Sequence, residues 1–172
     1  GACGTLTRCA QFLKLSSLLL MSYWLMKSEP HELSMDDLLR EPPRAFEWTG
    51  VRNYQARNFM RDQMQPGDQV LFWHSSCPQP GIAGLAEVAS AAVADSSQFD
   101  PASPYFDARS RPEAPRWVSV TVRGLRPTRL ISPAELRSHA ELAEMTVLKR
   151  GNRLSITPVT PAEWAFITEQ LI

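Results

Sequence analysis

The segment from Glu47 to Asp62, EWTGVRNYQARNFMRD, concentrates side chains that are suited to binding an anion. Arg57 and Arg61 are four residues apart, so on a helix they would repel each other by about 0.2 to 0.5 kcal/mol. A bound anion would offset that repulsion. Arg52 and Asn53 come just before the same expected helix, whose first N–H groups and positive dipole end favour a phosphate or a carboxylate. The alternative is that Asn53 only caps the helix and the arginines are solvated.

Aromatic residues accompany this segment and stand at the ends of the expected strands. They are Trp24, Trp48, Tyr54, Trp73 and Trp117. Aromatic rings beside arginines are the groups on which nucleic-acid bases stack, and each such stack contributes about 1 to 3 kcal/mol. The alternative is that two or three of these rings simply fill the hydrophobic core. The combination therefore indicates a site for bases and phosphates.

A different chemistry is possible at Lys27 and Glu29, which are two residues apart at the end of an expected strand and so share one face. A lysine beside a glutamate can act as a base or a nucleophile when burial lowers its pKa. The alternative is an ion pair that fixes the strand end. His74 and Cys77 also have the spacing of a base and a thiol, but one cysteine in a proline-bounded loop is more typical of an incidental residue.

Motifs for metals and cofactors are missing from the sequence. The histidines His31, His74 and His139 are far apart, and no Cys-x-x-Cys or His-Glu-x-x-His pattern occurs. The glycine-rich loops that hold nucleotide phosphates, Gly-x-Gly-x-x-Gly and the Walker loop, are absent as well. We therefore expect neither a metal nor a cofactor.

Composition favours one domain with no general attraction to polyanions. The chain has 172 residues, and 18 basic residues balance 18 acidic ones, so a nucleic acid must meet a local basic patch. Of the three cysteines only Cys77 lies beyond the first twenty residues, which fits a reducing, cytoplasmic compartment. The apolar run within residues 1–20 is too short for a membrane span. We interpret residues 1–20 as a disordered extension, either non-native or a leader, before a domain at 21–172.

Short strands and short helices alternate without the rhythm of a parallel sheet. Strands are expected at residues 23–27, 69–74, 82–93 and 116–124, with a helix as the alternative for 82–93. Helices are expected at residues 54–63 and after the caps Ser34, Ser132 and Thr160. Residues 95–115 are expected to form an irregular loop, and a protein partner is one use for such a loop. These features predict an α+β domain around a curved or barrel-like sheet.

Seven blocks of the sequence, in order, resemble the EVE domain family of the PUA-like superfamily. They are YWLMKSEP (23–30), WTGVRNYQARNFMR (48–61), GDQVLFWHS (67–75), PGIAGLAEV (80–88), FDPASPYFD (99–107), PRWVSV (115–120) and RLSITPVTPAEW (153–164). The resemblance implies a PUA-like mixed β-barrel of five to six strands with short flanking helices. It also implies a module that reads a modified base, with modified cytosine in DNA favoured, and not established catalysis.

The implied partners are modified DNA or RNA, or a free modified nucleoside, and neither a membrane nor a metal. The superfamily also includes small hydrolases that act on acylated nucleosides. An amidohydrolase of that kind, using Lys27 and Glu29, is therefore the alternative function. A buried base must be taken from a single strand or flipped out of a duplex, which costs a few kcal/mol.

Carried over by position, the resemblance places a base-binding pocket and phosphate contacts on this chain. The pocket residues are Lys27, Ser28, Trp48, Asn53, Tyr54, Asn58, Trp73, His74, Trp117 and Ser155. The phosphate-binding residues are Arg52, Arg57 and Arg153. Trp48 and Trp73 are expected to stack on the base, while Ser28, Asn53 and Asn58 are expected to read its polar edges. Cys77 and Pro78 depart from the polar residues expected before PGIAGLAEV, so the rim is less defined there.

Overall fold

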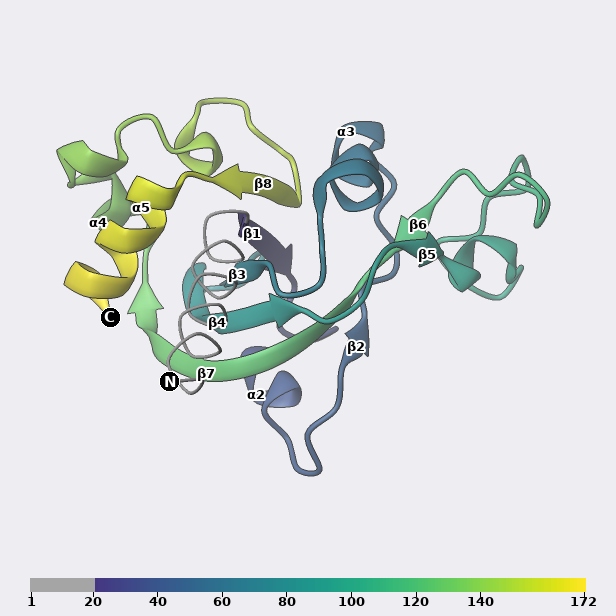
Figure 1. The fold of residues 1–172 in the computed structure, drawn as a ribbon, viewed down its shortest axis with the longest axis horizontal. Helices are drawn as coiled ribbons and strands as arrows, with labels where there is room; N and C mark the ends of the chain where they lie inside the picture. The colour runs from purple at the N-terminus through teal and green to yellow at the C-terminus, as the bar shows by residue number, and fades with distance from the viewer. Residues whose placement is uncertain (1–20) are drawn as a thin grey trace, which may run out of the picture.

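The computed structural model describes residues 21–172, so the prediction for residues 1–20 lies outside the described residues. A curled sheet forms a half-barrel flanked by short helices, which confirms the predicted α+β class (Figure 1). Six strands are hydrogen-bonded in the order β2-β7-β4-β3-β1-β8, and β5 and β6 form a separate ribbon that projects from one end. None of the described helices is long and apolar enough to cross a membrane.

The elements are short. The strands are β1 (Tyr23–Ser28), β2 (Phe46–Glu47), β3 (Gln69–His74), β4 (Gly81–Val88), β5 (Val93–Ala94), β6 (Val118–Ser119), β7 (Thr121–Ile131) and β8 (Ile156–Val159). The α-helices are α2 (Met35–Leu38), α3 (Tyr54–Asn58), α4 (Pro133–Arg137) and α5 (Pro161–Phe166). Turns of 3-10 and π-helix are η1 (Phe59–Gln63), η2 (Ser96–Phe99), η3 (Ala140–Leu142), η4 (Thr146–Leu148) and η5 (Ile167–Leu171).

Helix starts follow the predicted caps. The side chain of Ser34 caps α2, that of Ser132 caps α4 and that of Thr160 caps α5, each accepting a backbone N–H three residues on. Asn53 caps the helix that starts at Tyr54, and its side chain accepts from Gln55 N and Ala56 N. This helix continues as the π-turn η1, so the predicted span 54–63 is confirmed.

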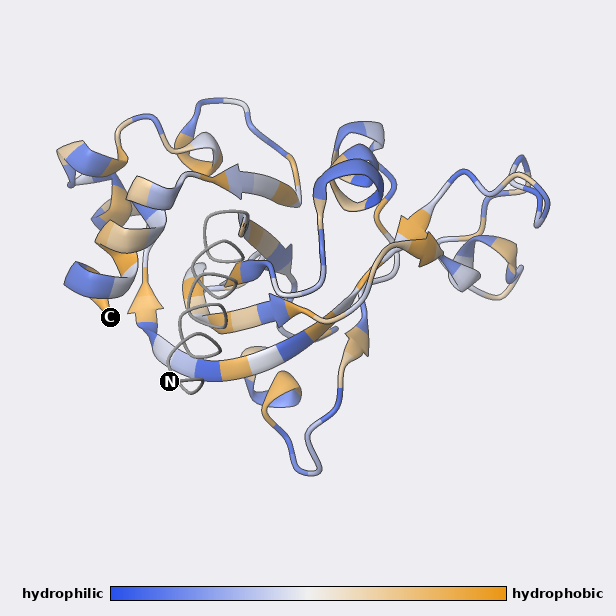
Figure 2. Ribbon diagram, viewed as in Figure 1, coloured by the Kyte–Doolittle hydropathy of each residue, from blue (hydrophilic) through white to orange (hydrophobic). Residues whose placement is uncertain are grey.

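Alternate residues of the central strands face two hydrophobic cores. Trp24 and Met26 point to one core, which α2, α3 and η1 cover, whereas Leu25 points to the other, which α4 and the C-terminal turns cover. Figure 2 shows hydrophobic segments on the strands and on α4 and α5 beside them. Because both faces of β1 and β3 are buried, these strands read as nearly continuous apolar runs.

Parallel pairing of β1 and β3 brings their C-terminal ends to one edge of the sheet. Lys27 lies opposite Trp73, and Ser28 lies opposite His74. The other pairs in this sheet are antiparallel, and the backbone N–H of Lys27 donates to the carbonyl of Ser155 just before β8. Residues from three distant parts of the chain therefore meet where these strands end.

Two predicted strands differ from the observed ones. The segment 82–93 contains β4, which ends at Val88, and then turns before β5, so the helix alternative is wrong. The strand predicted at 116–124 is broken at Val120 and resumes as β7, which runs on to Ile131. Val120 accepts a hydrogen bond from Trp48 N at 2.7 Å, and the chain passes there from the β5–β6 ribbon into the main sheet. Register shifts in β4 accommodate Pro127 in β7.

Candidate functional site

A cavity of about 640 Å³ lies at the C-terminal ends of β1 and β3. Its lining residues are Lys27, Ser28, Glu29, Glu32, Leu33, Phe46, Glu47, Trp48, Thr49, Gly50, Val51, Arg52, Ser75, Ser76, Tyr105, Arg153 and Ser155. Most of them end or follow β1, form or follow β2, or follow β3, and the others come from the loop after η2 and from the segment before β8. The wall combines apolar rings, hydroxyl groups, carboxylates and cations. Such a mixture suits a small planar ligand that carries polar edges.

Six of the thirteen predicted site residues line this cavity. They are Lys27, Ser28, Trp48, Arg52, Arg153 and Ser155. The structure places the other seven elsewhere, namely Asn53, Tyr54, Arg57, Asn58, Trp73, His74 and Trp117.

Lys27 stands on the ring of Trp73. Its Nζ lies 5.9 Å from the ring centroid, and Trp73 itself is 5% exposed within the second core. No described carboxylate forms an ion pair with Lys27. Its sequence neighbour Glu29 faces His31 instead, with 3.4 Å between Glu29 Oε2 and His31 Nε2. Burial lowers the pKa of Lys27 below its ordinary value. Lys27 is thus a half-buried amine without a bound acid, and Trp73 lies behind it.

Trp48 and Ser28 expose only part of their side chains to the cavity, because other protein groups contact the rest. Trp48 is 7% exposed, and its ring meets that of Phe72 edge to face with 5.8 Å between centroids. The Ser28 hydroxyl donates to the carbonyl of Leu33 at 2.7 Å, which fixes the turn after β1 and leaves the oxygen as an acceptor. Arg153, by contrast, is exposed and makes no hydrogen bond or ion pair with the described residues.

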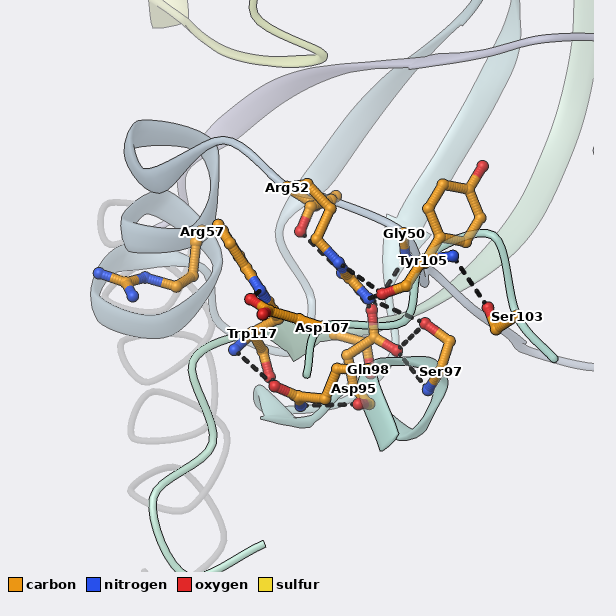
Figure 3. A network of polar contacts seen from close by, with 12 residues as sticks. Gly50, Arg52, Arg57, Asp95, Ser97, Gln98, Ser103, Tyr105, Asp107 and Trp117 are labelled. Carbon is orange, nitrogen blue, oxygen red and sulfur yellow. Dashed lines mark hydrogen bonds and ion pairs between the residues drawn. The ribbon is translucent and has the colours of Figure 1, made fainter. Parts of the chain in front are cut away.

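Arg52 is held by the loop between β5 and β6 (Figure 3). Its guanidinium donates to the carbonyls of Val51 and Tyr105, to Asp95 Oδ2 at 3.0 Å and to Ser97 Oγ at 3.1 Å. Burial alone would raise the pKa of Asp95, but the hydrogen bonds from Ser97, Gly50 and Arg52 outweigh it and hold that pKa below its usual range. The guanidinium also lies over the rings of Tyr105 and Trp117, with 5.6 and 5.4 Å to their centroids.

Four of the predicted residues, three on α3 and one before β6, form an outer cluster. Trp117 stacks on Tyr54 with centroids 4.9 Å apart, and the Arg57 guanidinium lies 4.6 Å from the Tyr54 centroid. Asn58 accepts from Arg57 at 2.9 Å, and the indole N–H of Trp117 donates to Asp107 at 2.9 Å. These side chains bind one another outside the cavity, and Tyr54 is 45% exposed.

His74 belongs to a second hollow of about 460 Å³, which also includes Cys77 and Leu130. Its Nε2 accepts the backbone N–H of Met35 at 3.0 Å, so this nitrogen does not serve as a base for the thiol. Burial lowers the pKa of His74, which keeps the ring neutral and suits that acceptor role.

The model of the EVE domain matches this chain over residues 22–170. This chain belongs to the EVE domain family. The resemblance inferred from the seven sequence blocks is thereby confirmed. The match extends from the residue before β1 into the last turn, η5, so it includes every strand of the half-barrel and every wall of the cavity.

Relatives of this EVE domain include proteins of known structure. Human thymocyte nuclear protein 1 is 39% identical over 165 residues, which cover 86% of this chain and 73% of the relative. A crystal structure from Pseudomonas putida is 47% identical, with a TM-score of 0.81 over 86% of this chain and 97% of that chain. The crystal structure of human THYN1 protein in complex with 5-methylcytosine containing DNA is 39% identical, with a TM-score of 0.81 over 86% of this chain and 96% of that chain.

Tyr105 is one of the cavity residues of this EVE domain that the predicted site set did not include. An ideal Cβ at Gly50 would lie 2.7 Å from the Tyr105 ring, so the ring packs directly on the Gly50 backbone. The phenol donates to Glu32 Oε1 at 3.3 Å, and burial, together with that carboxylate, raises the pKa of Tyr105. The signal available in the sequence was the block FDPASPYFD, which contains Tyr105 within a loop that has no periodic pattern.

Among residues 21–172, one group of side chains has ligand atoms close enough for a metal. Glu29, His31 and Glu32 place a ligand atom each within 4.8 Å of one another in the turn after β1. Glu29 and His31 are solvent-exposed over much of their surfaces, and Glu32 is also bonded to Tyr105. Exposed carboxylates commonly adopt such spacing, so we assign no ion to this turn.

Proposed function

We propose that this EVE domain reads a modified base, and that modified cytosine in DNA is its favoured ligand. The observation that carries the proposal is the cavity itself, which combines ring surfaces, carboxylates and an arginine without an ion pair among the described residues, at the edge of the half-barrel. Further support comes from the human THYN1 protein, which was crystallised with DNA that contains 5-methylcytosine. RNA and free modified nucleosides belong to the same chemical class and enter the test below.

The walls of the cavity suit a cytosine that has left its stack. Carboxylates accept hydrogen bonds from the exocyclic amine of cytosine, and Glu29, Glu32 and Glu47 all reach the cavity. Leu33, Phe46 and Trp48 supply apolar surface for the ring and its added methyl group. Arg153 would hold the phosphate beside the extruded base. Extrusion from a duplex costs a few kcal/mol, which the contacts inside the cavity must recover.

Discrimination by a methyl group in an apolar pocket is limited to about 1 to 3 kcal/mol. We therefore expect a preference of roughly 10- to 200-fold and no absolute selectivity. A balanced net charge predicts weak, salt-sensitive binding to unmodified polymer.

The proposal is tested by fluorescence titration with short DNA and RNA carrying cytosine, 5-methylcytosine, 5-hydroxymethylcytosine or N6-methyladenine, and with the free nucleosides. Trp48→Phe runs beside the wild type, and thermal unfolding shows whether the variant is folded. We expect tighter binding to one modified cytosine, a smaller preference in the variant and only partial loss at high salt. Equal, salt-labile binding of every oligomer by a folded wild type would contradict the proposal.

One observation favours a second candidate, an amidohydrolase acting on acylated nucleosides. Lys27 faces the cavity with a lowered pKa and without an ion pair among the described residues, which are the conditions for an amine that acts as a base or nucleophile. Release of free cytidine from an acylated cytidine, lost in Lys27→Ala, would support it. Absence of turnover at high protein concentration would exclude it for that substrate, while leaving base binding intact.

A further inference from the structure

We propose that Arg52 and Asp95 are positioning residues that fasten Tyr105 as the selective wall of the cavity. On this inference, which rests on the proposed function, the two residues set the preference for the modified base through Tyr105, and Arg52 does not contact phosphate. The group formed by Arg52, Asp95, Ser97 and the backbone of Tyr105 is called the Tyr105 clamp below.

The donors of Arg52 are fully used within the protein. A guanidinium carries five N–H bonds in a fixed fork and has no acceptor. Nε and Nη2 both donate to the carbonyl of Tyr105, at 3.0 and 2.7 Å, and the other three N–H bonds point to Val51, Asp95 and Ser97. A phosphate could therefore bind Arg52 only by replacing one of these contacts.

Asp95 joins the cavity wall to the loop that carries Tyr105. Its carboxylate is fully buried, and it accepts Gly50 N at 2.9 Å and Arg52 Nη1 at 3.0 Å through Oδ2. Its other oxygen accepts both the N–H and the hydroxyl of Ser97. All four lone-pair positions are thus occupied, and one buried group holds segments that are 45 residues apart.

The clamp determines where the Tyr105 ring lies. One side of the ring is closed by the Gly50 backbone, which leaves no room for a Cβ, and the phenol is bonded to Glu32 at 3.3 Å. Gly50 and Glu32 line the same cavity as Tyr105. A ring fixed at its backbone, its face and its hydroxyl is a rigid wall, which is what size discrimination of one methyl group requires.

Arg153 provides the contrast within the same cavity. It is exposed, lines the cavity and makes no hydrogen bond or ion pair with described residues, so its donors are available for a phosphate. Substitution of Arg52 should therefore change the preference for the modified base, whereas substitution of Arg153 should change the salt dependence of binding.

The experiment compares Arg52→Lys, Tyr105→Ala, their double variant and Arg153→Ala in the full chain. Arg61→Lys is the matched control, because Arg61 is exposed and bonds only to its neighbour Asp62 among described residues. Affinities for duplex DNA with 5-methylcytosine and with cytosine are measured at several salt concentrations. Amide hydrogen exchange is followed for Gly50 and Ser97, whose N–H groups donate to Asp95.

Lysine keeps the charge of Arg52 but has one side-chain nitrogen, so it cannot replace five hydrogen bonds to four acceptors. We expect Arg52→Lys to reduce the ratio of the two affinities toward one, to keep the slope of log K against log salt and to speed exchange at Gly50 and Ser97. The double variant should be no less selective than Tyr105→Ala. Arg153→Ala should keep the ratio and reduce the slope by about 0.9, as expected for one lost phosphate contact on duplex DNA. Arg61→Lys should change neither the ratio nor exchange.

Two results would overturn the inference: an Arg52→Lys protein that keeps its preference while the salt slope falls, or one in which exchange at Gly50 and Ser97 is unchanged. If Arg52→Lys does not fold, Ser97→Ala removes the hydroxyl that accepts from Arg52 and donates to Asp95, and it should give a smaller change of the same kind. A wild type without any preference would instead refute the proposed function. Amide exchange at Gly50 and Ser97 would then test the clamp without the binding data. Faster exchange in Arg52→Lys would support the clamp, and unchanged exchange would refute it.

Discussion

The arginine at the cavity rim and the arginines that contact the chain around the β5–β6 loop have the same guanidinium group, but they differ in whether protein acceptors already occupy its donors. Arg153 at the rim is exposed and has no hydrogen-bond or ion-pair partner among the described residues. Arg52, in contrast, makes five hydrogen bonds to four acceptors, and Arg57 donates to Asn58 and to the carbonyl of Arg116. A positive charge near a cavity therefore identifies a phosphate contact only when its donors are unused. The following predictions test this contrast, starting with the largest expected effect.

Removing Asp95, the carboxylate that binds Arg52, should reduce the stability of the fold more than any of the other substitutions. Asp95→Ala leaves the guanidinium of Arg52 and the N–H of Gly50 without their partner in a buried place. Breaking a buried pair from one side costs about 3 kcal/mol or more of unfolding free energy. Urea denaturation measures the loss. Asp62→Ala, which breaks an exposed pair with Arg61, should leave the midpoint unchanged. Equal midpoints for the two variants would remove the distinction between the regions.

Gly50 and Gly67 offer a matched pair for the ring contact. Both have positive φ, +83° and +93°, but a Cβ would meet the Tyr105 ring only at Gly50 and has open space at Gly67. Gly67→Ala should lose about 1 kcal/mol from backbone strain, and Gly50→Ala about 1 to 3 kcal/mol more from overpacking. Thermal unfolding and binding of modified DNA are measured for both. A Gly50→Ala protein that is as stable and selective as Gly67→Ala would refute the close packing of Tyr105.

Acid should weaken the clamp through Asp95. Its pKa is held below the ordinary value of 3.8, so ionisation stabilises the fold fully above that pH, and this contribution is lost as pH falls through the folded pKa. We expect the stability difference between wild type and Asp95→Asn to be constant above 3.8 and to shrink below it. Denaturation at a series of pH values measures this difference, and a difference that grows on acidification would contradict the assignment.

On the rim side, loss of a cation should affect every DNA alike. Arg153→Ala is expected to weaken binding of modified and unmodified oligonucleotides by the same modest factor, without a change in unfolding temperature, because the side chain is exposed and makes no hydrogen bond or ion pair with the described residues. Arg137→Ala on α4, which covers the other core, is the control and should bind normally. A selective loss for modified DNA in Arg153→Ala would place this arginine on the base.

The smallest effect concerns the charge of Lys27. Because burial lowers its pKa from the ordinary 10.5, Lys27 loses its proton at a lower pH than an exposed lysine does. Binding of DNA by the wild type should therefore weaken as pH rises through that lowered pKa, whereas Lys27→Gln should bind more weakly and without this dependence. Parallel titrations over the alkaline range measure the difference. Identical pH profiles would exclude a contact between the amine and the ligand.

Features of the fold that depend on neighbouring residues could be predicted from the sequence. The caps Ser34, Asn53 and Thr160 act within three residues, and they start helices as expected. The strand Gln69–His74 is also confirmed, because its apolar run is local. The break at Val120 could not be predicted, since it depends on partners in β2, β4 and β5.

The site was harder to predict because its contacts join distant residues. Arg52 and Tyr105 are 53 residues apart, and nothing in the spacing of either segment indicates that they meet. The pattern of β3 also predicted a strand without showing which face Trp73 would take. Residue type indicated the kind of ligand, but the state of each donor depended on the tertiary structure.

The parallel pairing of β1 and β3 has a consequence for how such a domain can evolve. Both strands end at the cavity, and the segments that follow them, residues 29–33 and 75–76, contribute to its wall without belonging to the sheet. Substitutions there can change which ligand is admitted while the register of the strands stays the same. The same half-barrel can therefore present different cavity walls in proteins whose segments after β1 and β3 differ.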